Sequence, residues 1–455
     1  MVRVETKYAR ALRRLARTLL MVLGIVALGA TSAVASPPPV DLGRVSTVQA
    51  TYTPNLVSGS FPADSHTQVW GYVPMGGVMY ACGDFAQVTS SDGRTTYSRD
   101  NLFAFDPNTG AINGFAPHVN GPVETCVGSP DGTAIYIGGE FSQVNGQTAD
   151  NIAKIVVATG QLDPTFSAAT NQLVSELAVT HKRLLVGGSF SLVDGQPRKA
   201  LATVTLGTGT LDPYMNLDIA GQVAPNSGPT RVYRFAISPN QVNVVAIGNF
   251  TSVNGVKHQG AFRFTLGAAA PRLVTWDYHR LYTLCGPTLD MPVWSRDVQF
   301  SPNGKYFVID GTGGQDSTHD KMTLCDTAAR WETATLGTDV APTWRNHTCV
   351  DTLHSVAVTS AAVYVQGHQK CVTGPDGTEV PRFGIAALSP TTGRALPWRS
   401  DQSRLIGGRY LMITNAADQP GFPSGLWSGC DCHDEGGVIF RPVRTAPLVA
   451  TPSAP

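Results

Sequence analysis

The chain has 455 residues, with 47 glycines and 31 prolines, and only 15% of its residues are charged. This composition predicts many short strands joined by turns. It excludes a mainly helical protein, because no long run of helix-forming residues with a helical period occurs. Basic and acidic side chains balance at 33 each, so the basic excess typical of nucleic-acid-binding proteins is missing.

Residues 1–35 have the pattern of a secretory signal peptide. Six basic residues precede an apolar run that ends at Ala33-Val34-Ala35, small residues that suit a cleavage site. An uncleaved signal anchor is the alternative, because the apolar run approaches the length of a short membrane span. Cleavage would leave 27 basic and 32 acidic residues and no second stretch able to cross a membrane. We therefore expect a secreted, extracellular protein.

Residues 36–45 are expected to be a linker, and residues 46–54, "STVQATYTP", predict a single strand without partners of its own. Four copies of one phrase follow: "GVMYACGDFAQV", "AIYIGGEFSQVNGQ", "RLLVGGSFSLVDGQ" and "NVVAIGNFTSVNGV". Their phenylalanines, Phe85, Phe141, Phe190 and Phe250, are 56, 49 and 60 residues apart. A period of this size indicates a repeat architecture.

Each copy belongs to a unit of four short strands. An apolar strand such as "VETCVGSPDG" precedes the phrase, and a strand with a tight turn such as "NIAKIVVATGQLDPTF" follows it. Glycine pairs allow a close approach to a neighbour, and Asn-Gly accepts the positive φ of a hairpin turn. One sheet of this kind cannot bury both of its faces, so similar sheets are expected to stack side by side.

The phrase GGxFxxVNG, the "IAKI" strand and "GxLDPxF" together resemble the delta-60 repeat β-propellers of exported bacterial proteins. The likeness is strongest in residues 77–256 and extends more loosely to about residue 442. It implies an all-β chain folded as a β-propeller. It implies little about function, because members of the family are mostly uncharacterised and propellers perform many unrelated tasks.

Weaker units follow at 296–314, 353–398 and 409–443, and the last of them lacks a fourth strand. We therefore predict a seven-bladed β-propeller over residues 46–442, with six or eight blades as alternatives. The strand at 46–54 is expected to complete the last blade and to join the two ends of the ring. Residues 443–455 are expected to form a disordered tail rich in proline, alanine and threonine.

An even number of cysteines in an exported chain favours disulfides. The preferred pairs are Cys285–Cys325 and Cys349–Cys371, followed by Cys82–Cys126. Cys430 and Cys432 remain, and they could pair with each other, bind a metal with His433 or join another molecule. His347, His354 and His368 lie near one another in the sequence, but surface or hydrogen-bonded roles are favoured over a metal site. No metal and no cofactor are expected.

Alignment of the first strands brings charged and aromatic residues to the predicted central channel. The candidates for ligand binding there are Trp70, Glu124, Glu176, Tyr233, Arg234, Arg296, Asp297 and His354. One interpretation is a polar cavity that suits a sugar or a peptide. The other is structural: Glu176, Arg234 and Asp297 form ion pairs between neighbouring blades, because charges near an axis need partners.

The sequence contains no nucleophile elbow, zinc-protease helix motif, P-loop or calcium-binding loop. We therefore predict a secreted non-catalytic binding or scaffold module whose partner is an extracellular protein or glycan, with no nucleic acid. The alternative is a glycan-cleaving hydrolase or lyase at the channel mouth that uses Glu124, Glu176 and Asp297.

Overall fold

The computed structural model describes residues 44–57, 67–223, 227–282, 285, 293–313, 324–349, 352–400, 410–429 and 437–443. The predicted signal peptide, nearly all of the linker, the tail after residue 443, Cys430 and Cys432 lie outside these residues. Within them, no helix combines the length and the apolar character needed to cross a membrane. The helix that is described is the short 3-10 turn η1 (His279–Tyr282).

The described part of the chain contains nine antiparallel sheets of three or four strands, so the prediction of an all-β chain is confirmed. Seven of these sheets follow the predicted units along the chain and are numbered here in that order. The first sheet contains β2 (Gln68–Met75), β3 (Val78–Asp84) and β6 (Leu102–Phe105). The second contains β7 (Val123–Gly128), β8 (Ala134–Gly139), β11 (Ile152–Val156) and β12 (Gln161–Leu162). The third contains β13 (Val174–Thr180), β14 (Arg183–Gly188), β17 (Leu201–Thr205) and β18 (Leu211–Asp212).

The later units form sheets of the same kind, although only the fourth unit keeps the repeated phrase and the fifth to seventh have lost it. The fourth contains β20 (Arg231–Ile237), β21 (Asn243–Asn249), β24 (Ala261–Leu266) and β25 (Pro271–Val274). The fifth contains β26 (Trp294–Phe300), β27 (Tyr306–Thr312), β28 (Thr327–Glu332) and β29 (Trp344–His347). The sixth contains β30 (Leu353–Val358), β31 (Val363–Gly367), β34 (Ile385–Leu388) and β35 (Ala395–Arg399). The seventh contains β36 (Tyr410–Thr414), β37 (Gly425–Gly429) and β38 (Val438–Pro442).

The residues after the repeated phenylalanine form small separate hairpins, which the sequence did not predict. In the second unit the turn between β9 (Gln143–Val144) and β10 (Gln147–Thr148) is Asn145-Gly146, with φ values of 52° and 75°. Both residues thus adopt the left-handed conformation of a tight hairpin turn. The equivalent strands are β4 (Gln87–Thr89) and β5 (Thr96–Ser98), β15 (Leu192–Val193) and β16 (Gln196–Pro197), β22 (Ser252–Val253) and β23 (Val256–Lys257), and β32 (Cys371–Thr373) and β33 (Glu379–Pro381). Two further short strands, β1 (Asn55–Leu56) and β19 (Ile219–Ala220), pair with β4 and β22.

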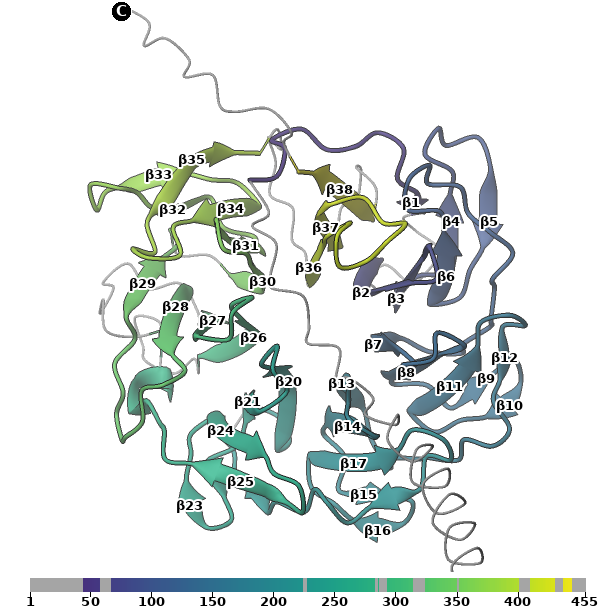
Figure 1. Cartoon of the computed structure of the whole chain (residues 1–455), viewed down its shortest axis with the longest axis horizontal. Helices are drawn as coiled ribbons and strands as arrows, with labels where there is room; N and C mark the ends of the chain where they lie inside the picture. Colours follow the sequence, from purple (N-terminus) through teal and green to yellow (C-terminus); the bar gives the residue numbers. More distant parts are fainter. Residues whose placement is uncertain are drawn as a thin grey trace, which may run out of the picture. The chain divides into compact units, whose positions relative to one another are not determined.

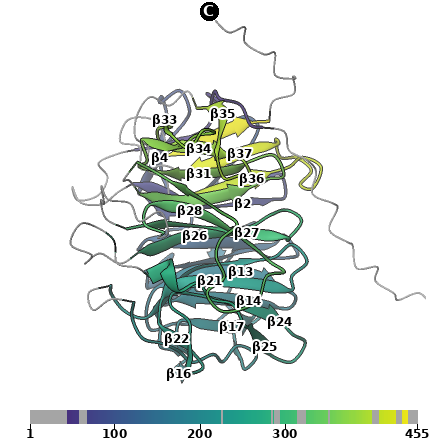
Figure 2. The ribbon, with the colours of Figure 1, turned by 90° about the vertical axis from the view of Figure 1, so that its left-hand side faces the viewer.

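The first strand of each sheet lies nearest the centre of the arrangement, and the later strands lie further out (Figure 1). Neighbouring first strands lie beside one another in the order β2, β7, β13, β20, β26, β30 and β36, and β36 lies beside β2. Figure 2 shows successive sheets crossing the view one above another, from β35 to β25. Side chains of every described sheet can therefore reach one central region.

Apolar cores lie between neighbouring sheets. Tyr80 of the first sheet packs with Ile135 of the second. The same pattern continues to the last pair, in which Trp427 of the seventh sheet packs with Phe105 of the first, with their ring centres 5.8 Å apart. The repeated phenylalanines, Phe85, Phe141, Phe190 and Phe250, are all buried in these cores. Each sheet is therefore stabilised on both faces by its neighbours, as the repeat predicts.

The segment after residue 44 runs beside β38. Val45 forms an antiparallel bridge with Val443, and the backbone N–H groups of Ser46 and Ala50 donate to the carbonyls of Pro442 and Phe440 at 2.7 and 2.8 Å. The prediction of a regular strand over residues 46–54 is wrong, however. No strand is assigned over these residues, and between the two bonds to β38 the Ser46 hydroxyl accepts the N–H of Val48 at 3.0 Å, a local bond that competes with regular strand pairing.

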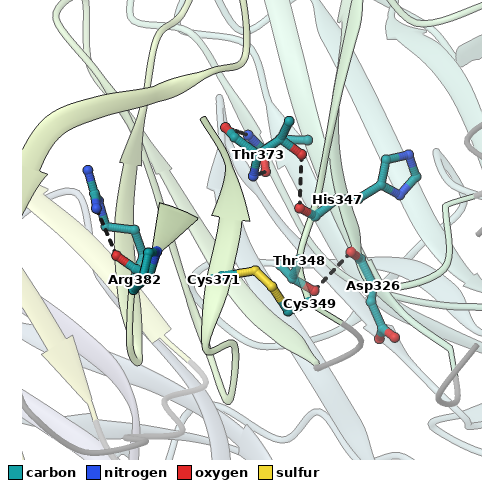
Figure 3. The surroundings of a disulfide bond; sticks show 9 residues. Asp326, His347, Thr348, Cys349, Cys371, Thr373 and Arg382 are labelled. Carbon is teal, nitrogen blue, oxygen red and sulfur yellow. Dashed lines mark hydrogen bonds between the residues drawn. A yellow bond between two sulfur atoms is a disulfide. The ribbon is translucent and has the colours of Figure 1, made fainter. Parts of the chain in front are cut away.

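All three preferred disulfides are confirmed: Cys82–Cys126, Cys285–Cys325 and Cys349–Cys371. The first connects β3 to β7 and so joins the first two sheets. The third joins the chain after β29 to β32, and Figure 3 shows its surroundings. There the Thr348 hydroxyl donates to the carbonyl of Asp326 at 3.1 Å. The Thr373 hydroxyl donates to the carbonyl of His347 at 3.2 Å.

Candidate functional site

Six of the first strands carry a β-bulge at the same place. In β13, Val174 pairs with Gly188 and Glu176 pairs with Gly187, so Ser175 is the extra residue. A bulge breaks the alternation of a strand and re-aims its side chains. The extra residues are Trp70, Glu124, Ser175, Tyr233, Arg296 and His354. Five of these six residues, all except Ser175, are candidates from the sequence. The remaining candidates, Glu176, Arg234 and Asp297, each come directly after an extra residue.

The glycine of the repeated phrase lies opposite the bulge. In each of the six sheets the residue before the extra residue pairs with a glycine, as Val123 does with Gly139. A Cβ atom at Gly139 would collide with the carbonyl of Pro122, which the bulge pushes toward it. The same collision would occur at Gly83, Gly188, Gly248 and Gly367. The repeat therefore encodes a bulge as well as a turn.

Glu176 and Arg234 join the third sheet to the fourth. The Arg234 guanidinium donates to a carboxylate oxygen of Glu176 at 2.7 Å and to the carbonyl of Ser175 at 2.8 Å. The Ser175 hydroxyl donates in turn to the carbonyl of Val232 at 2.6 Å. The exposed fractions of the Arg234 and Glu176 side chains are only 14% and 19%. This is the contact between neighbouring blades that the structural interpretation predicts.

Asp297 joins the fifth sheet to the sixth. One of its carboxylate oxygens accepts the N–H of Val298 at 2.8 Å, and the other accepts the N–H of Val356 in β30 at 3.0 Å. Its own N–H donates to the carboxylate of Asp310 at 2.7 Å. Asp297 and Asp310 are both buried. Asp297 therefore holds backbone amides of two sheets rather than facing a ligand.

Burial is the main cause of the raised pKa values of Glu176, Asp297 and Asp310. Loss of hydration raises the pKa of Glu176 to about 7, although the guanidinium of Arg234 opposes the rise. Burial likewise raises the pKa of Asp297 above its ordinary value, against the influence of Arg234. Burial and the charge of Asp297 raise the pKa of Asp310 further still. Perturbed carboxyls of this kind occur in active sites and in structural networks alike, so geometry must decide between the two.

A cavity of about 280 Å³ lies at the end where the first strands begin. Its charged and ionisable lining residues come from the second, fourth, fifth and sixth sheets: Glu124, Arg231, Arg234, Arg296 and His354. Tyr233, Trp294 and Ser295 are the other described lining residues. We call this space the mouth cavity. Since its volume is at the lower end of ligand sites, it suits a small molecule or the end of a chain.

Two arginines of the mouth cavity lie over aromatic rings. The Arg231 guanidinium is 5.4 Å from the ring centre of Tyr233, and that of Arg296 is 5.7 Å from the ring centre of Trp294. Arg231 also lies 3.6 Å from a carboxylate oxygen of Glu124. Burial raises the pKa of Tyr233, while both guanidiniums act against the rise. Arg231 and Arg296 therefore both lie close enough to Tyr233 to influence its hydroxyl group.

The structure divides the eight candidate residues into two groups. Glu124, Tyr233, Arg234, Arg296 and His354 line the mouth cavity. The described lining does not include Glu176, Asp297 or Trp70. Trp70 is buried, and its indole N–H donates to the side-chain oxygen of Gln68 at 2.8 Å.

Sequence reasoning missed Arg231, Trp294 and Ser295. Arg231 precedes Arg234 by three residues, just as Trp294 precedes Asp297. A third aligned row, at the position where each first strand begins, would therefore have revealed both of them.

The three histidines do not form a described metal site. The rings of His354 and His368 are 5.2 Å apart, whereas Nδ1 of His347 is hydrogen-bonded to the Thr327 hydroxyl at 2.8 Å. Among the described residues, the one group with metal-ligand spacing is Cys349, Cys371 and Glu379. Its two sulfur atoms are already joined in a disulfide, so they cannot act as thiolate ligands.

A second cavity, of about 620 Å³, is lined by the third and fourth sheets and lies at the end where β13 stops, at Thr180. Lys182, Arg183 and Tyr214 are among its lining residues. The Arg183 guanidinium is bonded to Asp212 at 2.6 Å and lies 4.2 Å from the ring centre of Tyr214. The Tyr214 hydroxyl donates to the carbonyl of Gly267 at 2.8 Å. These polar groups therefore connect the two sheets.

Residues 130–166 match a protein family described as "Domain of unknown function (DUF5122) beta-propeller". The match covers the "AIYIGGEFSQVNGQ" phrase and β8 to β12 of the second sheet. It agrees with the all-β arrangement and supports a β-propeller domain. No curated protein matches the chain.

Proposed function

We propose that the chain is a secreted, non-catalytic β-propeller of the delta-60 repeat type that binds an extracellular protein or glycan at the mouth cavity. The proposed propeller has seven blades over residues 46–442. Packing of Trp427 against Phe105 supports closure between the last blade and the first, and the bonds from residues 45–50 to β38 support closure by the N-terminal segment. The proposed signal peptide is 1–35, the linker 36–45 and the tail 443–455.

The binding proposal rests on the difference in surroundings between the carboxylates of Glu176 and Asp297 and the side chains that line the mouth cavity. The inner carboxylates hold neighbouring sheets together, whereas the mouth cavity gathers charged and aromatic side chains from four sheets around an open space. A purely structural network would need no such space, because buried charges are most stable when packed against their partners. Convergent polar groups around a cavity are typical of ligand sites.

Secretion is supported by the disulfides and by the basic-apolar start of the sequence. Three disulfides connect the described residues, and such bonds persist in oxidising compartments. Six basic residues before an apolar run and Ala33-Val34-Ala35 fit cleavage on export. N-terminal sequencing of the exported protein tests this step, and we expect a start at or close to Ser36.

The glycan-cleaving alternative is not supported by the described geometry. Glycosidases of the usual kind need two carboxyl groups on either side of the scissile bond. Glu124 is the one carboxylate among the described lining residues of the mouth cavity. Glu176 is bonded to Arg234, and Asp297 accepts two backbone amides. The raised pKa values of Glu176 and Asp297 thus belong to contacts between sheets.

The test is a binding screen of the purified chain on a glycan array and against secreted proteins, with His354→Ala as the mouth variant. We expect at least one ligand whose binding His354→Ala weakens, without release of sugar fragments during incubation. Binding that His354→Ala leaves unchanged would place the site elsewhere. Release of new reducing ends from a bound glycan would contradict a non-catalytic role.

A further inference from the structure

Guanidinium groups outnumber carboxylates among the described lining residues of the mouth cavity. Arg231, Arg234 and Arg296 line it, and Glu124 supplies the one carboxylate of the described lining. Arg234 is neutralised by Glu176 at 2.7 Å, while the nearest approach of Arg231 to Glu124 is 3.6 Å. Arg296 adds a third guanidinium, and its side chain is exposed to the cavity. An anionic ligand would complement this charge in a site that is partly shielded from water.

Two of these guanidiniums lie close to the phenol of Tyr233. Arg231 lies over the ring of Tyr233, Arg296 lies over the ring of Trp294, and both guanidiniums act on the Tyr233 hydroxyl. The bulges in β20 and β26 make Tyr233 and Arg296 the extra residues of their strands. Two adjacent sheets thus present two guanidiniums to one small region. Guanidinium groups bind carboxylates with charge-assisted hydrogen bonds, which are among the strongest in proteins.

The remaining described lining selects for a ligand rich in hydroxyl groups. No aliphatic side chain is among the described lining residues, and the apolar surface comes from the rings of Tyr233 and Trp294. Glu124 can accept hydrogen bonds, while Ser295 and His354 can donate or accept them. A peptide would present aliphatic side chains that find no apolar partner here. A sugar ring presents hydroxyl groups and a C–H face that fits against an aromatic ring.

We propose that the mouth cavity binds the carboxylate-bearing sugar unit of an acidic glycan, a uronic acid. Arg296 and Arg231 hold the carboxylate, Glu124 accepts hydrogen bonds from ring hydroxyls, and Tyr233 and Trp294 border the sugar. This inference rests on the proposed binding function and specifies its ligand class. The cavity volume of about 280 Å³ fits one end of an oligosaccharide rather than an internal stretch of a thick chain.

Calorimetric titration of the purified full-length mature chain with trigalacturonate and with trimannuronate tests the proposal. The methyl ester of each trisaccharide is the matched control, because it keeps the ring and loses the charge. We expect at least one acid to bind and its ester to bind roughly tenfold to a hundredfold more weakly. Added salt should weaken the binding of the acid. Equal binding of acid and ester, or binding of neither acid, would overturn the proposal.

Arg296→Ala and Arg296→Lys locate the carboxylate. The side chain of Arg296 is exposed, so both variants are expected to keep the thermal melting curve of the parent. Arg296→Ala should weaken uronate binding roughly tenfold or more, with partial recovery in Arg296→Lys, since lysine keeps the charge but loses the paired donors. Lys182→Ala in the second cavity is the control and should bind as the parent does. Loss of binding in Lys182→Ala alone would place the ligand there and contradict the proposal.

A tetraglutamate peptide distinguishes the source of the carboxylate. Tighter binding of this peptide than of either uronate would overturn the glycan assignment and leave a binding module for acidic peptides. A neutral glycan found in the array screen, bound at the mouth while both uronates fail, would also overturn the uronate proposal but leave the proposed function intact. Absence of every glycan and protein ligand would contradict the proposed function itself.

Discussion

Two neighbouring carboxyls of the fifth sheet, Asp297 and Asp310, differ in what they bind. Both carboxylate oxygens of Asp297 accept backbone N–H groups, which stabilise its ionised form. Asp310 accepts one N–H through Oδ1, while its buried Oδ2 has no hydrogen-bond partner among the described residues. Burial and the nearby charge of Asp297 therefore raise the pKa of Asp310 well above 3.8 and favour its protonated form.

Replacement of Asp310 with asparagine should reduce the pH dependence of stability. The folded protein keeps a proton on Asp310 that the unfolded chain loses above its ordinary pKa of 3.8. The free energy of unfolding therefore falls as pH rises above that value, up to the raised pKa of the folded state. Asparagine keeps the oxygen that accepts the Asp297 N–H but has no proton to lose. Denaturant unfolding at about pH 5 and pH 8 should show Asp310→Asn gaining on the parent at the higher pH. If the difference in free energy of unfolding between Asp310→Asn and the parent is the same at both pH values, the raised pKa of Asp310 is contradicted.

The ion pair between Glu176 and Arg234 predicts unequal effects of removing its two members. Arg234→Ala leaves a largely buried carboxylate without its partner and should lower the free energy of unfolding by about 3 kcal/mol. Glu176→Gln should cost less, because the Arg234 guanidinium keeps the carbonyl of Ser175 and remains near the carboxylates of Asp297 and Glu124. Urea unfolding of both variants and of the double variant provides the comparison. An Arg234→Ala effect no larger than that of Glu176→Gln would show that the pair is screened by solvent.

At the scale of the strands, the sequence predicted the elements well and their distortions poorly. The apolar runs and glycine turns around Phe141 and Phe190 indicated sheets of four strands, which the structure contains. The bulges were not predicted, because a bulge depends on the pairing of two strands and alternation within one strand does not reveal it. The glycine opposite each bulge was visible, but it also fits a turn or a close approach.

The repeated glycine offers a direct test of this explanation. At Gly188 an added methyl group would collide with the carbonyl of Leu173 beside the bulge. Gly188→Ala should therefore lower the free energy of unfolding by about 1–3 kcal/mol, as overpacking does. Gly207→Ala is the control, because its Cβ atom would have nothing within 4 Å and its φ is not positive. Thermal melting should show a loss in the first variant and little change in the second. Equal effects would mean that chain entropy, rather than the bulge, explains the glycine.

At the scale of the whole arrangement, the mouth cavity depends on contacts that no single repeat contains. Glu124, Tyr233, Arg296 and His354 come from four sheets, and alignment of the repeats brought them together correctly. Alignment did not separate the mouth residues from Glu176 and Asp297, which bond to the next sheet instead. That separation depends on side-chain direction at each bulge. Sequence spacing therefore predicted which residues gather near the axis, but not which of them face the cavity.

The joint between the two ends of the described chain supplies the last prediction. Val45 is buried between the sixth and seventh sheets, where its N–H bonds to the Tyr364 hydroxyl at 3.1 Å and its carbonyl accepts the Trp398 indole N–H at 2.8 Å. Val45→Asp would bury a charge there and should lower the free energy of unfolding by about 3 kcal/mol or more. Val48→Asp makes the same change three residues later, where the side chain is 58% exposed, and should have little effect. Hydrogen exchange should show β36 to β38 losing protection first in Val45→Asp, because these strands pack against Val45 and bond to the residues after it. If Val45→Asp and Val48→Asp have the same melting temperature, residues 45–50 do not help to hold the seventh sheet in place. The apolar core around Trp427 would then be the contact that joins the seventh sheet to the first.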